Sequence, residues 1–260
     1  MRLIRAERRS FAGTAAFLAD DGHREVVTTY FTDLARSLGD GSEPDLAGHS
    51  YGEMAGALLP DVVPDGEPVD LLVLAYAIHD MWPGRATATY LSHLCPGTPR
   101  SFAVCDQGSA APFTALRIIR DHGARRALLI VAEQASLPYR SAVTPPAEHR
   151  AVALLYGDDA GARVTDVRQY PDVHPAAVPE LASRGVAELS AGHGARVVLG
   201  DALADAWPGH DPGHERVPAG QPTTGVWWHL AGAFADSADP VVIADYDPAL
   251  RYLCLAAVSR

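Results

Sequence analysis

The chain contains no lysine and no asparagine, so all 21 of its basic residues are arginine. The absence of lysine excludes Schiff-base chemistry, which needs a lysine amine. The absence of asparagine excludes any mechanism that depends on an asparagine side chain. The 32 acidic residues outnumber the arginines and give the 260-residue chain a formal net charge of −11. Nucleic acid is therefore not an expected partner, because phosphate binding requires a net basic face.

Long apolar runs and cysteines are also scarce. No run of 18 or more apolar residues is present, and the segment MRLIRAERRS is not followed by the apolar region of a signal peptide. We therefore expect a cytoplasmic protein that does not associate with membranes. The three cysteines, Cys95, Cys105 and Cys254, lack the spacing of a metal site, so we expect reduced thiols and no bound metal.

Hydrophobic residues make up 48% of the chain, which is enough for a sizeable core. The run Val69–Ile78 is continuously apolar and of strand length, which predicts a strand covered on both faces. Near-helical spacing predicts a helix with a core-facing stripe made of Val26, Tyr30, Leu34 and Leu38. The alternation of strands and helices along the chain predicts a layered α/β fold.

The stretch from Ser101 to Gln134 organises these elements. It predicts, in order, an apolar strand at Phe102–Cys105, a small-residue turn at Asp106–Ala111, a helix at Phe113–His122 and a buried strand at Ala127–Ala132. The turn contains Gly108 and Ser109, which let the backbone bend sharply. The helix that follows points its free N–H groups at the turn, which is the geometry of a nucleophile elbow.

This stretch resembles the ketoacyl-ACP synthase III-like branch of the thiolase superfamily. Members of that branch carry the same strand, turn and helix, then a Gly-Ala-Arg-Arg-like turn and a strand that ends in glutamate. Gly123–Arg126 and Glu133 match those two features. The segment Arg150–Ala162 resembles the family's glycine-rich segment, with Asp159 in place of its middle glycine. The likeness covers residues 46–165 well and the rest thinly.

The resemblance implies a thiolase-like layered αβαβα fold of two pseudo-repeated halves. The first half, residues 1–165, carries the elbow, and the second half, residues 166–260, is shortened. In this family the strand before the turn pairs with its counterpart in a second subunit. A homodimer, or a heterodimer with a ketosynthase homologue, is therefore implied.

The acyl donor implied by the resemblance is acyl-CoA or an acyl carrier protein with a phosphopantetheine arm, and no tightly bound cofactor is expected. Such carriers are acidic, so a basic cluster near the predicted helix is a candidate docking surface. Its members are Arg117, Arg120, Arg125 and Arg126. A solvated helix face is an equally good interpretation of this cluster.

The catalytic positions depart from the family together. Its nucleophilic cysteine corresponds to Ser109 when counted back from the helix and to Gly108 when counted forward from the strand, but not to Cys105, which we expect within the strand. The family's histidine corresponds to Gly200, and Gln221 is the nearest substitute for its asparagine.

The family's oxyanion-binding turn corresponds to Ala244–Ala249. Two aspartates in this turn would repel a developing negative charge, and Pro248 removes a backbone donor.

Ser109 needs a base, because a serine alkoxide is far harder to form than a thiolate. The histidines that remain for this role are His149, His193, His210 and His214. His214 lies near Gln221 in a predicted loop at residues 208–222, so a Ser109–His214 pair is one hypothesis. A solvated histidine is the competing interpretation.

A second serine motif is present at Gly48–Glu53. It matches the Gly-His-Ser-x-Gly-Glu signature of malonyl-type acyltransferases, with Ser50 as the nucleophile. That chemistry needs a buried strand immediately before the serine, and residues 41–47 are polar and contain a proline. We therefore expect Ser50 to cap a helix, with Glu53 as its capping-box partner.

Two functions of different classes follow. The favoured one is a ketosynthase-like protein of a polyketide or fatty-acyl natural-product pathway, such as antibiotic biosynthesis, that does not catalyse decarboxylative condensation. It would be a partner subunit that shapes the acyl site of an active ketosynthase. The alternative is a non-condensing acyltransferase in which Ser109 moves an acyl group from ACP or CoA to an O, N or S acceptor. A malonyl-type acyltransferase that acts through Ser50 is a minor alternative. Whether the chain is an enzyme at all stays open at this point.

Overall fold

In the computed structural model, which describes residues 1–39, 41, 44, 46–64, 66–138, 144–190, 194–236 and 239–259, the chain forms a ten-stranded sheet. Its first five strands are β1 (Arg2–Phe11), β2 (Leu71–Ala75), β3 (Arg100–Val104), β4 (Arg126–Glu133) and β5 (His149–Gly157). The other five are β6 (Ala162–Tyr170), β7 (Arg196–Leu199), β8 (Glu215–Arg216), β9 (Val241–Asp247) and β10 (Tyr252–Ser259).

The two groups of five strands repeat one topology. The order β3-β2-β4-β5-β1 in the first group is matched by β8-β7-β9-β10-β6 in the second. β2 is parallel to β3 and β4, as β7 is parallel to β8 and β9, and the remaining pairs within each group are antiparallel. β1 and β6 join the groups through a short antiparallel pairing. The predicted domain boundary at residue 165 would fall inside β6, whereas the strand repeat divides between Gly157 and Ala162.

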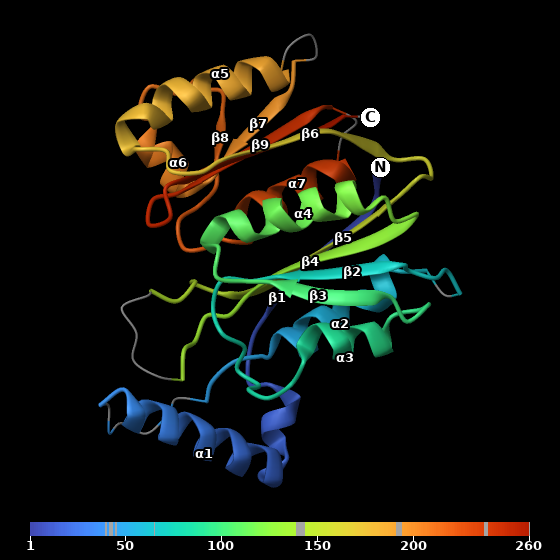
Figure 1. The fold of residues 1–260 in the computed structure, drawn as a ribbon, viewed down its shortest axis with the longest axis vertical. Coiled ribbons are helices and arrows are strands. Elements are labelled where there is room, and N and C mark those ends of the chain that lie inside the picture. The colour runs from blue at the N-terminus through green and yellow to red at the C-terminus, as the bar shows by residue number, and fades with distance from the viewer. Residues whose placement is uncertain are drawn as a thin grey trace.

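The helices form three layers around the sheet, as Figure 1 shows. α2 (Tyr51–Val62) and α3 (Thr87–Leu94) cover the outer face of the first half. α4 (Ala111–His122) and α7 (Gly225–Asp236) lie between the halves, and α5 (Val178–Ser190) and α6 (Asp201–Ala206) cover the outer face of the second half. α1 (Asp21–Ser37) lies apart from the sheet, below α2 and α3 in the view of Figure 1. The described residues also form three short 3-10 helices: η1 (Ala16–Ala19), η2 (Gly108–Ala110) and η3 (Pro175–Ala177).

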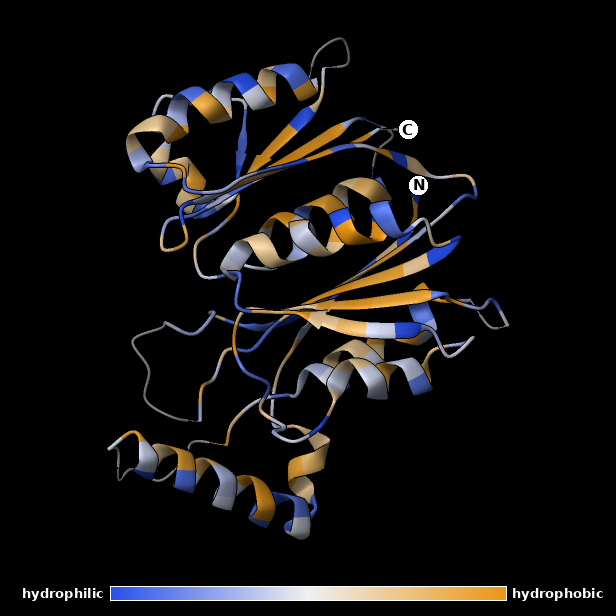
Figure 2. Ribbon diagram, in the orientation of Figure 1, coloured by the Kyte–Doolittle hydropathy of each residue, from blue (hydrophilic) through white to orange (hydrophobic). Residues whose placement is uncertain are grey.

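The layers follow from strands that are apolar on both faces. In β2, Leu71 and Val73 contribute to the central core with α4 and α7, whereas Leu72 and Leu74 contribute to the core under α2 and α3. Alternate side chains of a strand point to opposite faces, so a continuous apolar run supplies both cores. Figure 2 shows the resulting hydrophobic colouring of β2, β4 and α4. The predicted layered α/β fold of two pseudo-repeated halves is confirmed.

The predicted core face of α1 is wrong for three of its four residues, whereas the fourth, Leu34, is half-buried and packs against the core cluster. Val26, Tyr30 and Leu38 are 66%, 43% and 60% exposed. The buried stripe instead contains Val27 and Phe31, together with Ala35. It packs against Phe17, Leu18 and Met81. Both stripes have the same four-residue spacing, so periodicity alone could not choose between them.

Three local predictions also need correction. Strand β8 lies within the region predicted as the loop 208–222. Cys105 follows the end of β3 rather than lying within the strand. β9 continues to Asp247, so much of the turn predicted at Ala244–Ala249 is strand.

In the described part of the chain, no helix is both long and apolar enough to cross a membrane.

Candidate functional site

The elbow predicted from the sequence is formed by η2 at the start of α4. Ser109 lies in this turn and is only 7% exposed. Gly108 has a positive φ of 50°, and a Cβ atom at this position would lie 1.8 Å from Oδ2 of Asp247. A side chain larger than hydrogen therefore cannot occupy position 108 without displacing Asp247. The glycine allows the end of β9 to approach the turn closely.

A carboxylate group accepts a hydrogen bond from the backbone N–H of the elbow. Oδ2 of Asp247 accepts a hydrogen bond from the Ser109 N–H at 3.2 Å. Oδ1 of the same side chain accepts from the N–H groups of Ala249 and Leu250 at 3.0 and 2.9 Å. These bonds hold the carboxylate at the N-terminal end of α4, where the helix dipole favours a negative charge. The Asp247 carboxylate thus occupies the place at which the elbow N–H would bind an oxyanion.

A second carboxyl group faces the Ser109 side chain. Asp245 is 5% exposed, lies on β9, and its carboxyl group is within hydrogen-bonding reach of Ser109. Burial raises the pKa of Asp245 to about 8, and the hydrogen bonds from the Tyr246 N–H and from Ser109 offset only part of this shift. Desolvation disfavours the charged form of a carboxyl group, so Asp245 is protonated to a large extent at neutral pH.

Two cavities meet at Ser109. The smaller cavity, of about 120 Å³, is lined by Gly200, Gln221 and Asp245 as well as Ser109. The larger, of about 380 Å³, is lined mainly by apolar groups. Its lining residues include Tyr51, Ile78, Pro146, Pro222 and Leu250. A group attached to Ser109 would have space on both sides of the elbow.

Solved structures share this architecture. No protein-family model and no curated protein sequence matches the chain. The solved structure of the tetronic acid condensing enzyme AbyA1 matches with a TM-score of 0.63 and 15% identity, over 100% of this chain and 99% of AbyA1. The acyltransferase ChlB3 matches with a TM-score of 0.67 and 16% identity, over 99% of this chain and 97% of ChlB3. The 3-oxoacyl-[acyl-carrier-protein] synthase III from Aquifex aeolicus VF5 matches with a TM-score of 0.54 and 13% identity, over 74% of this chain and 77% of the synthase.

This chain has a thiolase-like fold. The resemblance seen in the sequence between residues 46 and 165 therefore extends, at the level of fold, to the whole chain. Identities of 16% or less show the fold alone, so the roles of the site residues must be argued from their own geometry.

In this thiolase-like fold, Gln221 lies beside Ser109 but has both ends of its amide engaged. Nε2 donates to the carbonyl of Glu148 at 3.3 Å, and Oε1 lies 3.2 Å from the hydroxyl oxygen of Thr224. Gln221 lines the smaller cavity with Ser109. Its contacts favour a structural role at the start of α7, and a catalytic role for it stays a prediction.

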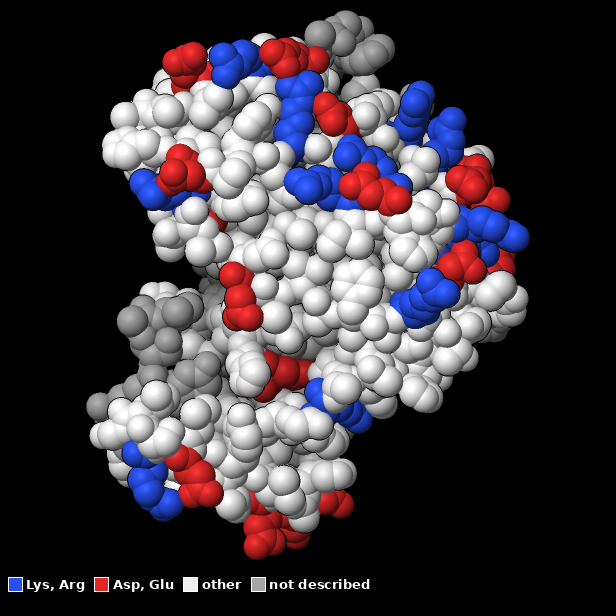
Figure 3. All heavy atoms as spheres, viewed as in Figure 1, with Lys and Arg blue, Asp and Glu red and all other residues white. Residues whose placement is uncertain are grey.

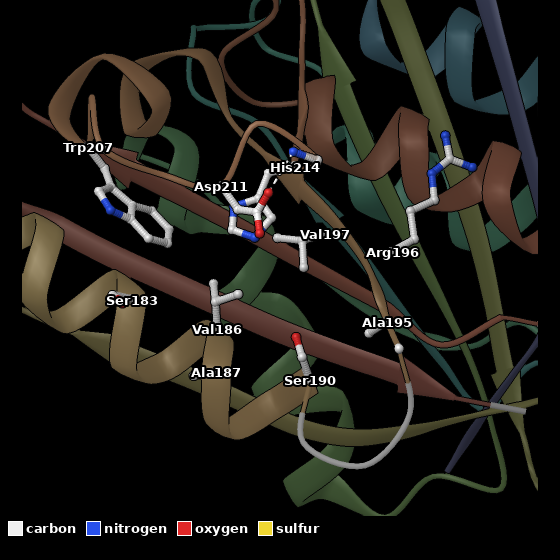
Figure 4. A pocket seen from close by; sticks show the side chains of 13 residues that line it. Ser183, Val186, Ala187, Ser190, Ala195, Arg196, Val197, Trp207, Asp211 and His214 are labelled. Carbon is white, nitrogen blue, oxygen red and sulfur yellow. Dashed lines mark hydrogen bonds between the residues drawn. The ribbon is translucent and has the colours of Figure 1, made fainter.

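His214 lies elsewhere. It lines a separate pocket with Ser190 and Trp207 on the α5 side of the sheet, as Figure 4 shows, and that pocket shares no lining residue with the two cavities at Ser109. Its ring lies 5.6 Å from that of Trp207 and 5.9 Å from that of His210. Burial lowers the pKa of His214. The structure therefore does not bring together the predicted Ser109–His214 pair.

The other described histidines do not take the place of His214 as a base for Ser109. Nδ1 of His149 accepts a hydrogen bond from the Ala135 N–H at 3.1 Å, and the ring packs against His49. Burial is the main cause that lowers the pKa of His149. His210 stacks on His214, and His193 lies outside the described residues. None of the described histidines lines a cavity at Ser109.

Of the four arginines predicted as a carrier-docking cluster, Arg117 lies near the middle of α4, and Arg120, Arg125 and Arg126 lie at or beyond its C-terminal end. Arg126 forms ion pairs with Glu67 and Asp159, and Arg120 forms ion pairs with Asp121 and Asp166. A 12-residue helix is about 18 Å long, so most of the length of α4 separates Arg120 and Arg126 from the elbow. Figure 3 shows basic side chains gathered on the side where α4 ends.

The remaining two arginines are less constrained. Arg117 donates to Gln169 at 3.2 Å, and Arg125 is exposed. Neither of these two forms an ion pair with an acidic side chain in the described part of the chain. Carrier docking at this cluster stays a prediction.

Ser50 is a helix cap, as the sequence predicted. Its hydroxyl accepts from the Glu53 N–H at 3.2 Å, and a Glu53 carboxylate oxygen accepts from the Ser50 N–H at 3.2 Å. Ser50 is fully buried, and no strand is present in the described residues between α1 and α2. The arrangement lacks the strand-to-helix elbow that a malonyl-type acyltransferase serine requires.

The sequence matched Glu133 to the end of a family strand and placed Asp245 in the oxyanion-binding turn, but it gave neither residue a role beside Ser109. Glu133 is 2% exposed, lines the larger cavity and accepts hydrogen bonds from the Thr223 N–H and the Thr224 hydroxyl. Burial raises its pKa. For Glu133, the available signal was its place at the end of a buried strand. For Asp245, it was an acidic residue within an otherwise apolar strand.

Proposed function

We propose that this chain is a ketosynthase-like acyltransferase that uses Ser109 and does not catalyse decarboxylative condensation. The observation that carries the proposal is the pair of carboxyl groups at Ser109: Asp245 faces the hydroxyl and Asp247 accepts from the N–H. Loss of carbon dioxide from a malonyl group produces an enolate, which needs hydrogen-bond donors around its oxygen. The Asp247 carboxylate beside the Ser109 N–H repels that charge, and position 200 supplies no side chain to donate.

Acyl transfer makes a smaller demand on the site. It needs a nucleophile, a base and space for the acyl chain, and it forms no enolate. Ser109 would be the nucleophile, and the apolar cavity of about 380 Å³ beside it suits an acyl chain. We propose an acyl-CoA or an acyl carrier protein thioester as the donor, and an alcohol, amine or thiol as the acceptor. The description of the similarly folded ChlB3 as an acyltransferase supports this proposal.

The N–H of Ser109 must be released for an oxyanion to bind there. Asp247 is half-buried and lines both cavities, so an incoming thioester would meet its carboxylate first. We propose that the thioester displaces this side chain from the Ser109 N–H. The setting would be a polyketide or fatty-acyl natural-product pathway in the cytoplasm.

A partner subunit of an active ketosynthase is the second candidate function. Strand β3 is an outer strand of the sheet, so one of its sides has no partner strand in the described residues. Such an edge favours pairing with a second chain. A partner subunit would need no working nucleophile, and the loss of the histidine and asparagine positions is equally consistent with this role.

Intact-mass spectrometry after incubation with octanoyl-CoA tests the proposal. We expect an octanoyl adduct on the parent chain and on Ser50→Ala, but none on Ser109→Ala. We also expect no release of carbon dioxide when radiolabelled malonyl-CoA is added. A carbon–carbon bond formed from malonyl-CoA by the chain alone would contradict the proposal. Absence of any adduct, together with heterodimer formation on co-expression with a ketosynthase of the same organism, would support the partner subunit instead.

A further inference from the structure

The smaller cavity at Ser109 contains a carboxyl group where the resemblance predicted a different catalytic side chain. By that resemblance, residue 200 is the position of the acid–base side chain, and this chain has glycine there. A Cβ atom built on Gly200 would lie 2.0 Å from Oδ1 of Asp245. The carboxyl group of Asp245 therefore fills the space into which a side chain at position 200 would project. Glycine at 200 is what allows Asp245 to lie there.

We propose that Asp245 is the general base that activates Ser109, in the space left open by Gly200. This inference rests on the proposed acyl transfer through Ser109. Asp245 and Ser109 line the same cavity, both are more than nine-tenths buried, and their side chains are within hydrogen-bonding reach. A buried base beside a serine hydroxyl is the arrangement that nucleophilic catalysis by serine requires. The dyad joins the start of α4 in the first half to β9 in the second.

In the acylation step, Ser109 passes one proton to Asp245 while one bond forms and one breaks. The ionised carboxylate of Asp245 takes the proton of the Ser109 hydroxyl as Oγ attacks the thioester carbonyl. The C–O bond forms, the C–S bond breaks, and the leaving thiolate takes the proton back from Asp245. The products are an acyl ester on Ser109 and a free thiol. Attack by an acceptor hydroxyl, amine or thiol reverses these roles and releases Ser109.

The charges around Asp245 set its working pH. Asp247 on the same strand and Glu133 at the end of β4 both raise the pKa of Asp245, in addition to the larger effect of burial. Asp201 at the start of α6 lines the same cavity but is paired with Arg216. A base with a pKa of about 8 is well matched to proton transfer near neutral pH.

The rate at which Ser109 is acylated, followed by intact mass from pH 6 to pH 10, tests the dyad. The probes are p-nitrophenyl acetate, a small activated ester, and octanoyl-CoA. For the parent chain we expect the rate to rise with pH and to reach half of its maximum near pH 8, as Asp245 ionises. For Asp245→Asn we expect a rate at least a hundredfold lower, with no inflection near pH 8.

Two glycine variants separate the position of the carboxylate from the stability of the fold. Gly200→Ala keeps both dyad residues but places a methyl group against Asp245, so we expect acylation at least tenfold slower. Gly209→Ala is the matched control, because a Cβ atom there meets nothing within 4 Å, and we expect no change. Thermal unfolding of each variant shows whether it is folded.

The outcomes distinguish failure of the Ser109–Asp245 dyad from failure of acyl transfer through Ser109. If Ser109 is acylated equally fast in the parent, Asp245→Asn and Gly200→Ala chains, with the same pH profile, Asp245 is not the base, and acyl transfer through Ser109 stands. If the parent forms no adduct with either probe at any pH, acyl transfer and the dyad are both overturned.

Discussion

At the scale of single residues, the site is dominated by the cost of burying carboxyl groups. Asp245 and Glu133 are each at least 95% buried, and burial raises the pKa of both. Glu133 is stabilised by hydrogen bonds that join β4 to the start of α7. Asp245 has fewer hydrogen bonds that offset the cost of burial, so we expect its protonation state to respond strongly to changes in pH.

Replacement of Asp245 should therefore change how stability depends on pH. The pKa of Asp245 is near 3.8 in the unfolded chain and about 8 in the folded chain, so the unfolded state loses its proton first as pH rises. The parent chain then loses stability between pH 4 and pH 8, whereas asparagine does not titrate. We expect the free energy of unfolding of Asp245→Asn, relative to the parent, to increase by roughly 2–5 kcal/mol between pH 4 and pH 8.

Urea unfolding at pH 4, 6 and 8 measures this difference. Asp158→Asn, at an exposed position, is the matched control for the removal of one carboxyl group. A constant difference for Asp245→Asn would mean that the folded chain holds Asp245 ionised throughout, against the buried environment described above.

At the scale of elements, α2 depends on its capping box. Ser50→Ala removes the hydroxyl that accepts from the Glu53 N–H, and we expect the free energy of unfolding to fall by about 1 kcal/mol, and by no more than about 2. Acylation of Ser109 should be unaffected. Ser37→Ala, at the exposed end of α1, is the control for stability. Complete loss of acyl transfer in folded Ser50→Ala would restore the malonyl-type interpretation.

The buried face of α1 can be tested with neighbouring valines. Val27 is 2% exposed and packs in the cluster with Phe31 and Met81, so we expect Val27→Ala to lower the free energy of unfolding by about 2 kcal/mol. Val26 is 66% exposed, and Val26→Ala should change it by less than about 0.5 kcal/mol. Chemical denaturation measures the change in the free energy of unfolding for both variants. Equal effects would mean that α1 does not pack as described.

At the scale of the whole molecule, we expect the outer edge of β3 to be the surface through which two chains associate. The Arg100 N–H donates to the Asp70 carbonyl, and the Val104 carbonyl accepts from the Tyr76 N–H, so these residues point their backbone groups toward the β2 side. Alternate residues point the other way, which leaves Ser101 and Ala103 facing outward. Edge pairing with a second chain would use their backbone groups.

Ala103→Pro removes one outward N–H without removing a bond to β2. If the proposed dimer forms through this edge, the variant should elute as a monomer, while Ala103→Val, which keeps the N–H, should elute with the parent. Size-exclusion chromatography with light scattering measures the mass, and circular dichroism checks the fold. A parent chain that is monomeric, or a variant that stays dimeric, would show that this edge is not the interface.

The amino-acid sequence determined the features that depend on neighbours along the chain. The apolar run of β2, the strand–turn–helix elbow at Ser109 and the capping box at Ser50 were all predictable, because each reflects the local pattern of side chains. The absence of lysine and asparagine likewise limited the chemistry that the chain can perform, because composition does not depend on folding.

Only the tertiary structure decided which residues meet at Ser109. The sequence pointed to His214, but the packing of the two halves brings the end of β9 to the elbow and leaves His214 in a separate pocket. The tertiary structure also decided that Val27, rather than Val26, lies on the buried face of α1. The physical reason is the same in both cases. Contacts between distant segments depend on how sheets and helices pack, and residues with equivalent local patterns are separated only by that packing.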